Sequence, residues 1–283
     1  MVFKSLVEKI NCRRLDAIIE IAGNPDTSEE KLAELSKNKE DDVRESVAGN
    51  PSTPAETLVE LSKDEKHWVK GLAIENPKMP KERLMELGKD ENQNIRCEVA
   101  LNLSTPVETL VELSKDKKGM VRADSAKNPK MPKERLMELG KDENSDVRAA
   151  AGRNQNTPAE TLAELGKDEN YWVRESVAWN LNTPVKTLMK LGNDEHQYVR
   201  ESVAGNPSTP AETLAELGKD ISNDVRTIIA ENYNTPIETL IRLSVDESDD
   251  VRESVAGNPS VPAETLAELG RKRKSTRWPA PPR

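Results

Sequence analysis

The chain has 283 residues, of which 33% are charged and only 3% are aromatic, with a single phenylalanine. So few large apolar side chains argue against one large globular core and favour many small layers of leucine and valine. The formal net charge of −9 argues against general binding to nucleic acid, because an acidic surface repels phosphate groups.

The first residues, 1–16, predict a helical cap. Phe3, Leu6, Val7 and Ile10 have helical spacing and would cover the exposed end of a core. The segment mixes charges throughout and lacks the apolar stretch of a signal peptide. No apolar run in the chain approaches the ~18 residues that span a bilayer. We therefore expect a cytoplasmic protein without a membrane span.

Residues 17–270 consist of about ten repeats of 26 residues. A Val-Arg pair or a close variant of it marks each repeat from Val43-Arg44 to Val251-Arg252, with no insertion or deletion between copies. A fixed period of this length indicates a repeat architecture, in which neighbouring units share a continuous core. The sequence therefore predicts one array of stacked units.

Each repeat predicts two helices. In one unit, residues 53–64 form the first helix, with Thr53 as N-cap, Pro54 at the first helical position and Glu56 completing a capping box. Leucines spaced by three turn this helix toward the core, and a polar turn leads to a second helix at 68–76. No segment alternates with a period of two, so strands are not expected.

The unit V-R-x-x-V-A-x-N-P-x-T-P-x-x-T-L-x-x-L-x-x-D resembles the leucine-rich repeat variant family, whose layout is similar to HEAT-like helical repeats. The resemblance implies an all-α fold, a right-handed α-solenoid in which one of the two helices is short or 3₁₀. Members of that family can carry an N-terminal cysteine-rich iron–sulfur segment. This chain has only Cys12 in that region, so the cluster is not expected.

Two columns of polar residues recur at fixed positions, and we interpret both as structural ladders. The arginines would form charge-assisted hydrogen bonds with aspartates such as Asp64 in the turns, as in HEAT-like repeats. The asparagines mostly precede proline, and their side-chain amides would bond backbone groups freed at helix ends. The predicted ladder residues are Arg44, Arg96, Arg122, Arg148, Arg174, Arg200, Arg226, Arg252, Asn50, Asn76, Asn102, Asn128, Asn154, Asn180, Asn206 and Asn232.

The opposite face of the second helix varies between repeats and collects aromatic residues. Exposed aromatics beside arginine are typical of binding hot spots, and arginine can form a cation–π contact with them. Drift of unselected outward positions, or packing between neighbouring helices, is the alternative interpretation, and for Trp68 we prefer it. The candidate partner-binding residues are Trp172, Trp179, Tyr198, Tyr171, Arg153, Trp68 and Met120.

The sequence contains no motif for nucleophilic, phosphate-binding or zinc chemistry. Cys12 and Cys97 have no metal spacing, and His67 and His196 lie about five repeats apart. We therefore predict no enzyme activity, no cofactor and no bound metal. HEAT-like folds can host enzymes, but only with a non-repetitive cluster, for which Tyr171–Trp172 with Asp146 is a weak candidate.

The last residues, 271–283, hold six basic residues and predict a disordered tail. It would serve as a localisation signal or anionic tether, or as a solvated end without a role. For the array, the leading hypothesis is a scaffold that binds a basic or neutral protein or peptide through the variable face. A passive rod or spacer is the alternative, and an enzyme or a nucleic-acid binder comes after it.

Overall fold

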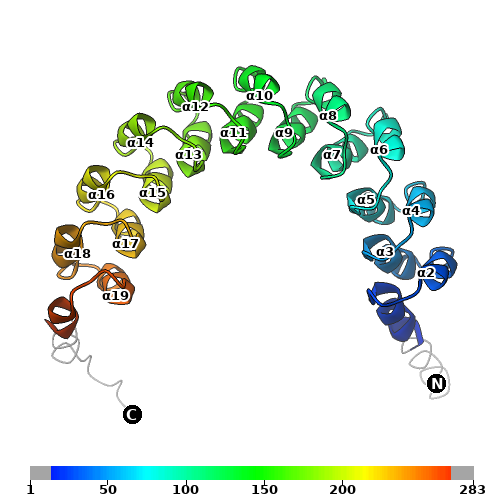
Figure 1. Ribbon diagram of the computed structural model, residues 1–283, viewed down its shortest axis with the longest axis horizontal. Coiled ribbons are helices and arrows are strands. Elements are labelled where there is room, and N and C mark those ends of the chain that lie inside the picture. The colour runs from blue at the N-terminus through cyan, green and yellow to red at the C-terminus, as the bar shows by residue number, and fades with distance from the viewer. Residues whose placement is uncertain (1–13, 269–283) are drawn as a thin grey trace, which may run out of the picture. The chain divides into compact units, whose positions relative to one another are not determined.

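The computed structural model describes residues 14–268, which form α-helices joined by short turns and contain no β-strand (Figure 1). Helices of seven and nine residues alternate along the chain. Residues 14–23 and 263–268 are also helical. Most of the predicted cap and the whole predicted tail lie outside the described residues. The predicted all-helical solenoid of 26-residue repeats is confirmed, and over the described range both helices of the repeat are α-helices.

The helix bounds follow the repeat without a shift. The seven-residue helices are α2 Glu29–Leu35, α4 Ala55–Leu61, α6 Lys81–Leu87, α8 Val107–Leu113, α10 Lys133–Leu139, α12 Ala159–Leu165, α14 Val185–Leu191, α16 Ala211–Leu217 and α18 Ile237–Leu243. The nine-residue helices are α3 Asp41–Gly49, α5 His67–Glu75, α7 Gln93–Leu101, α9 Gly119–Lys127, α11 Ser145–Arg153, α13 Tyr171–Trp179, α15 Gln197–Gly205, α17 Asn223–Glu231 and α19 Asp249–Gly257.

The chain divides into two compact units at Arg135/Leu136, within α10. Inside each unit the nine-residue helices lie side by side in one row and the seven-residue helices in another (Figure 1). Neighbouring nine-residue helices pack against each other more closely than neighbouring seven-residue helices do. The core of each unit lies between its two rows.

The core is made of small apolar side chains from both rows. In the second unit, Val199 and Val203 of α15 meet Leu214 and Leu217 of α16, and all four are at most 3% exposed. Their spacing of three and four residues places them on one side of each short helix. Neither helix has enough apolar surface to be stable alone, so each repeat depends on its neighbours.

The predicted capping box is wrong. Pro54, in extended conformation, is the residue before α4, and no side chain caps this helix. The hydroxyl of Thr53 instead donates to the carbonyl of Val47, 2.6 Å away, in the last turn of α3. Thr53 is fully buried, and its hydroxyl shares the Val47 carbonyl with the N–H of Asn50, the residue after α3. The same bond is made by Thr105, Thr157, Thr183, Thr209 and Thr235.

The asparagine column joins successive repeats. The Asn206 amide nitrogen donates to the carbonyls of Ala178 and Asn180, at 2.7 and 3.1 Å, in the preceding repeat. Its amide oxygen accepts from the Ser208 N–H at 2.8 Å, so the buried side chain is fully used. A bond to the carbonyl 28 residues earlier is also made by Asn50, Asn76, Asn102, Asn128, Asn180, Asn232 and Asn258.

The arginine column joins most of the nine-residue helices to two turns. Arg200 donates through Nε and Nη2 to the two carboxylate oxygens of Asp220, at 2.6 and 3.0 Å. Its Nη1 donates to the Asp194 and Glu195 carbonyls in the turn before α15. The equivalent pairs are Arg44–Asp64, Arg96–Asp116, Arg148–Asp168, Arg174–Asp194 and Arg226–Asp246. Lys70 stands at this position in one repeat of the first unit.

These pairs change the acidity of their aspartates. Burial is the largest influence on Asp220 and raises its pKa. The hydrogen bonds from Arg200 and from the Ser222 N–H act in the opposite direction, and together they leave the pKa below its ordinary value of 3.8. The folded state therefore favours the ionised carboxylate.

Replacing Asn206 with alanine should lower the free energy of unfolding by about 2 kcal/mol, because the Ala178 carbonyl loses its donor and the Asn180 carbonyl keeps only the Thr183 N–H. Urea unfolding followed by circular dichroism measures this loss. Asn182→Ala is the matched control, since the exposed Asn182 amide also reaches the preceding repeat, at 2.7 Å from the Gln155 carbonyl. If Asn182→Ala lowered the free energy of unfolding as much as Asn206→Ala, the buried amide would not be the more stabilising of the two.

Acid should destabilise the array through the aspartates of the ladder. Because the folded-state pKa of Asp220 lies below 3.8, its contribution is present above pH 3.8 and is lost as the pH falls through the folded value. Asp220→Asn should cost about 1–3 kcal/mol at pH 7, since the bonds it weakens involve charged groups. The difference from the unmodified protein should shrink toward pH 2. A difference that stays constant from pH 7 to pH 2 in thermal melts would refute this account.

Candidate functional site

The candidate site is the exposed side of α13 and α15 in the second unit, with one residue from α11. We call it the aromatic face, and its residues are Arg153, Tyr171, Trp172, Trp179 and Tyr198. Trp172, Trp179 and Tyr198 are 55%, 52% and 50% exposed, although all three are large apolar or partly apolar side chains. Their helices are fixed from behind by buried Val173, Val177, Val199 and Val203.

Rings from two successive repeats contact each other at the start of α13 and α15. Tyr171 and His196 are stacked, with ring centroids 3.6 Å apart and planes 11° from parallel. Trp172 lies against Tyr171 at 5.0 Å, and Tyr198 lies against His196 at 5.3 Å. The four rings therefore form one continuous surface across the junction between the repeats.

Sequence reasoning missed His196 as a member of this surface. It lies in the turn immediately before α15, outside the helical positions that were compared between repeats. The available signal was its place in the next repeat, 25 residues after Tyr171 and two before Tyr198.

The other end of α13 carries a cation–π contact. The Arg153 guanidinium carbon, from the end of α11, lies 4.7 Å from the centre of the Trp179 ring. Such a contact holds the tryptophan in place while leaving half of it exposed. Rings thus occupy both ends of α13.

Glu175 lies between these two ends on the same side of α13. One of its carboxylate oxygens, Oε2, is buried and has no hydrogen-bond partner among the described residues, and the same holds for Nδ1 of His196. Burial is the main cause that raises the pKa of Glu175, and Glu201 adds to it. Arg153 and His196 act in the opposite direction without cancelling the effect. Neighbouring cations and hydrogen-bond donors therefore compensate the negative charge of Glu175 only in part.

Further acidic groups surround the aromatic face. Glu201 of α15 accepts from Gln197 Nε2 at 2.7 Å, and the same nitrogen donates to Asp224 of α17 at 3.0 Å. Asp146 and Glu231 occupy the corresponding outward positions of α11 and α17. The nine-residue row of α11 to α17 therefore presents more carboxylates than cations.

Two predicted site residues, Trp68 and Met120, lie in the first unit. Trp68 is 39% exposed, with the edge-on ring of His67 at 4.9 Å and the Lys66 ammonium 5.5 Å from its ring centre. Met120, on α9, is 59% exposed. The structure brings together the other five predicted residues and adds His196 and Glu175.

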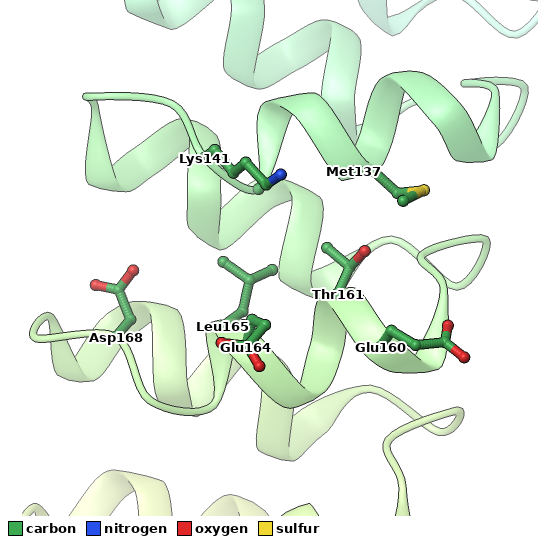
Figure 2. Close-up of a pocket in the computed structure, with 8 residues that line it drawn as sticks. Met137, Lys141, Glu160, Thr161, Glu164, Leu165 and Asp168 are labelled. Carbon is green, nitrogen blue, oxygen red and sulfur yellow. The ribbon is translucent and has the colours of Figure 1, made fainter.

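A hollow of about 240 Å³ opens between α10 and α12 in the second unit. Figure 2 shows Met137 and Lys141 on one side of it, with Thr161, Leu165 and three carboxylates on the other. Two of those carboxylates are already paired, Asp168 with Arg148 at 2.6 Å and Glu164 with Lys167 at 2.8 Å. These ion pairs recur in other repeats, so they do not mark a special site. The residues that line the hollow do not place a nucleophile beside a general base.

Within residues 14–268, no group of three or more histidine, cysteine, aspartate or glutamate side chains could hold a metal ion. None of the described helices has the length and apolar character to cross a membrane.

Replacing Glu175 with glutamine should raise the melting temperature at pH 8 by roughly 2 °C. The pKa of Glu175 is above its ordinary value of 4.5 in the folded state, so ionisation makes folding less favourable as the pH rises through that range. The gain should therefore vanish near pH 4. Glu164→Gln is the control, because the exposed Glu164 is paired with Lys167 at 2.8 Å. An equal gain at pH 4 and pH 8 would contradict the ionic origin of the effect.

The comparisons with known proteins agree with this architecture. The model of the leucine-rich repeat variant family matches residues 41–65. A solved structure described as a leucine-rich repeat variant with a novel repetitive structural motif is 26% identical, with a TM-score of 0.52, over 78% of this chain and 87% of that chain.

Two other solved structures share less with this chain. An engineered protein is 19% identical over 90% of this chain and 93% of that chain, with a TM-score of 0.42. The YibA protein of Escherichia coli is 15% identical over 82% of this chain and 98% of that chain, with a TM-score of 0.48. No curated protein sequence matches. The family model and the 26% identical structure confirm a helical repeat fold that is similar to the leucine-rich repeat variant.

Proposed function

We propose that the chain is a non-enzymatic scaffold that binds an extended protein or peptide partner through the aromatic face. The observation that carries this proposal is the continuous surface of Tyr171, Trp172, His196 and Tyr198 across two repeats, with Trp172 and Tyr198 half exposed. Aromatic side chains held in fixed positions supply large contact area at low entropic cost, and they dominate binding hot spots.

The charge around the aromatic face favours a basic partner. Glu175, Glu201, Asp146 and Asp224 surround the rings, and Arg153 is already engaged with Trp179. Lysine and arginine side chains would be attracted by these carboxylates and by the faces of the exposed rings. The overall negative charge of the chain would also speed the approach of a basic segment.

The spacing of the rings suits an extended segment. Trp172 and Trp179 are seven residues apart on one helix, which corresponds to about 10 Å along its axis. A peptide in the extended polyproline II conformation has three residues per turn and advances about 3.1 Å per residue. Side chains three residues apart in such a peptide lie on the same side, about 9 Å apart, and would therefore reach the two tryptophans.

The double variant Trp172→Ala/Trp179→Ala should weaken binding by at least about 30-fold, since the loss of one hot-spot ring alone costs on the order of 2 kcal/mol. The probe is a set of lysine- and arginine-containing peptides selected from a random display library on the unmodified protein. Fluorescence anisotropy measures their affinity, and circular dichroism should show unchanged helix content.

Trp68→Ala serves as the control, because it removes an exposed tryptophan from the first unit. Equal affinity of the double variant and the unmodified protein would refute the proposed face. A library that yields no binding peptide at all would instead favour a passive spacer.

A further inference from the structure

The last residue of a nine-residue helix faces the sixth residue of the next nine-residue helix in the row. In the second unit, Ser254 of α19 donates through Oγ to Oε1 of Glu231, the last residue of α17, at 3.1 Å. The equivalent residues of α5 and α7 are Glu75 and Glu98. This junction of the first unit therefore places two carboxyl groups where the other junction has a hydroxyl and a carboxylate.

Glu75 and Glu98 are hydrogen-bonded to each other. A carboxylate is only an acceptor, so this bond exists while one of the two groups carries a proton. Burial is the largest cause that raises the pKa of the half-buried Glu98, followed by the bond to Glu75 and the charges of Glu75 and Asp124, and the pKa reaches about 7. The pair therefore holds its proton in weakly acidic solution and loses it near neutral pH.

The charged groups that face the Glu98 carboxyl are acidic. Glu75 faces it from α5. Asp124 faces it from α9, where it is bonded to Lys127 at 2.8 Å and accepts from the buried Cys97 thiol. Among the described residues of α5, α6, α8 and α9, no cation offsets the charge of Glu98. When the proton leaves, two negative charges repel each other across the junction of α5 and α7.

The same junction lacks the ion pair of the arginine ladder. Arg44 and Arg96 each donate twice to the aspartate 20 residues later. The corresponding residue of α5 is Lys70, whose side chain forms no hydrogen bond or ion pair with any residue in 14–268. The Asp90 carboxylate, 20 residues after Lys70, accepts from the Asn92 N–H at 2.8 Å. An ammonium group lacks the two-pronged geometry with which a guanidinium binds a carboxylate.

α5 and α7 also pack less closely than their neighbours. In the first unit, α3 with α5 and α7 with α9 are both in closer contact than α5 with α7. Gly71 of α5 brings no side chain to this junction, and a Cβ added to it would lie 3.6 Å from Oε1 of Glu98. Asn102 still bonds the Ile74 carbonyl across the junction. Fewer contacts and a missing ladder pair make this the place where the row opens most easily.

We infer that the junction between α5 and α7 is a proton-dependent hinge, which is closed while Glu75 and Glu98 share a proton and loosens when both are ionised. Because the pKa of Glu98 lies above its ordinary value of 4.5 in the folded state, the stabilisation is complete below pH 4.5 and is lost as the pH rises through about 7. The bond from Asn102 keeps the layers connected, so the opening is local.

The hinge is independent of the proposed function. It lies in the first unit, whereas the aromatic face belongs to the second. A failure of one proposal therefore leaves the other standing.

Hydrogen–deuterium exchange of the full chain tests the hinge, read by mass spectrometry in peptides that cover α5 and α7. Glu98→Gln is the comparison, because its amide can donate to Glu75 at any pH. At pH 8, α5 and α7 should exchange at least about threefold faster in the unmodified protein than in the variant, and at pH 5.5 the two should match. Comparing two proteins at one pH cancels the pH dependence of the chemical exchange itself.

Glu231→Gln is the matched control, since it removes a carboxylate from the same position of α17, where the partner is Ser254. It should leave the exchange of α5 and α7 as in the unmodified protein at both pH values. Equal exchange of the unmodified protein and Glu98→Gln at pH 8 would overturn the inference. An excess as large at pH 5.5 as at pH 8 would do the same, as would an equal excess in α17 and α19.

Lys70→Arg tests the second part of the hinge, because it restores the guanidinium that could bind Asp90 twice. It should reduce the excess exchange of α5 and α7 at pH 8. An undiminished excess would overturn the role given to the missing ladder pair.

Discussion

The bond from a buried asparagine amide to the main chain of the preceding repeat is the interaction on which the rest of the structure depends. A nine-residue helix has too few turns to be stable alone, and its last carbonyls have no partner within it. Asn206, the residue after α15, donates to one such carbonyl, that of Ala178 in α13, and also to the carbonyl of Asn180 just beyond that helix. Repeated through each unit, this bond fixes the distance and rotation between layers, which in turn brings the rings of Tyr171 and His196 within 3.6 Å.

Much of the fold could be predicted from the sequence because the repeats impose it many times over. The period, the two helices and the inward leucines and valines are each determined by local pattern and burial, and these features agree in every repeat. The capping box failed for a reason that is not local. Thr53 and Glu56 have the right spacing, but the threonine is buried against the end of α3, where its hydroxyl donates to the Val47 carbonyl. Tertiary contact overrode a valid local preference.

The candidate site was less predictable, because it depends on turns as well as helices. Helical phase places Trp172, Trp179 and Tyr198 on one face, and adjacent repeats place Arg153 near Trp179. The helical phase does not predict where the His196 ring lies, because the turn that precedes α15 sets its position. Nor does it show that Glu175 keeps one oxygen buried without a partner. The variable positions of the nine-residue helices follow no structural rule shared by all repeats, and the aromatic face is made of them.

The acceptors of the asparagine bonds are backbone carbonyls, which every amino acid carries. A repeat therefore does not need to recognise the side chains of its predecessor, only the main chain. A unit copied by duplication in the gene would be accepted by whichever neighbour it meets, with no compensating change. The chain contains such a copy, since NPKMPKERLMELGKDEN at 76–92 returns unaltered at 128–144. The bond that holds the layers together thus allows the array to gain or lose whole repeats during evolution. Single outward residues can change independently of it.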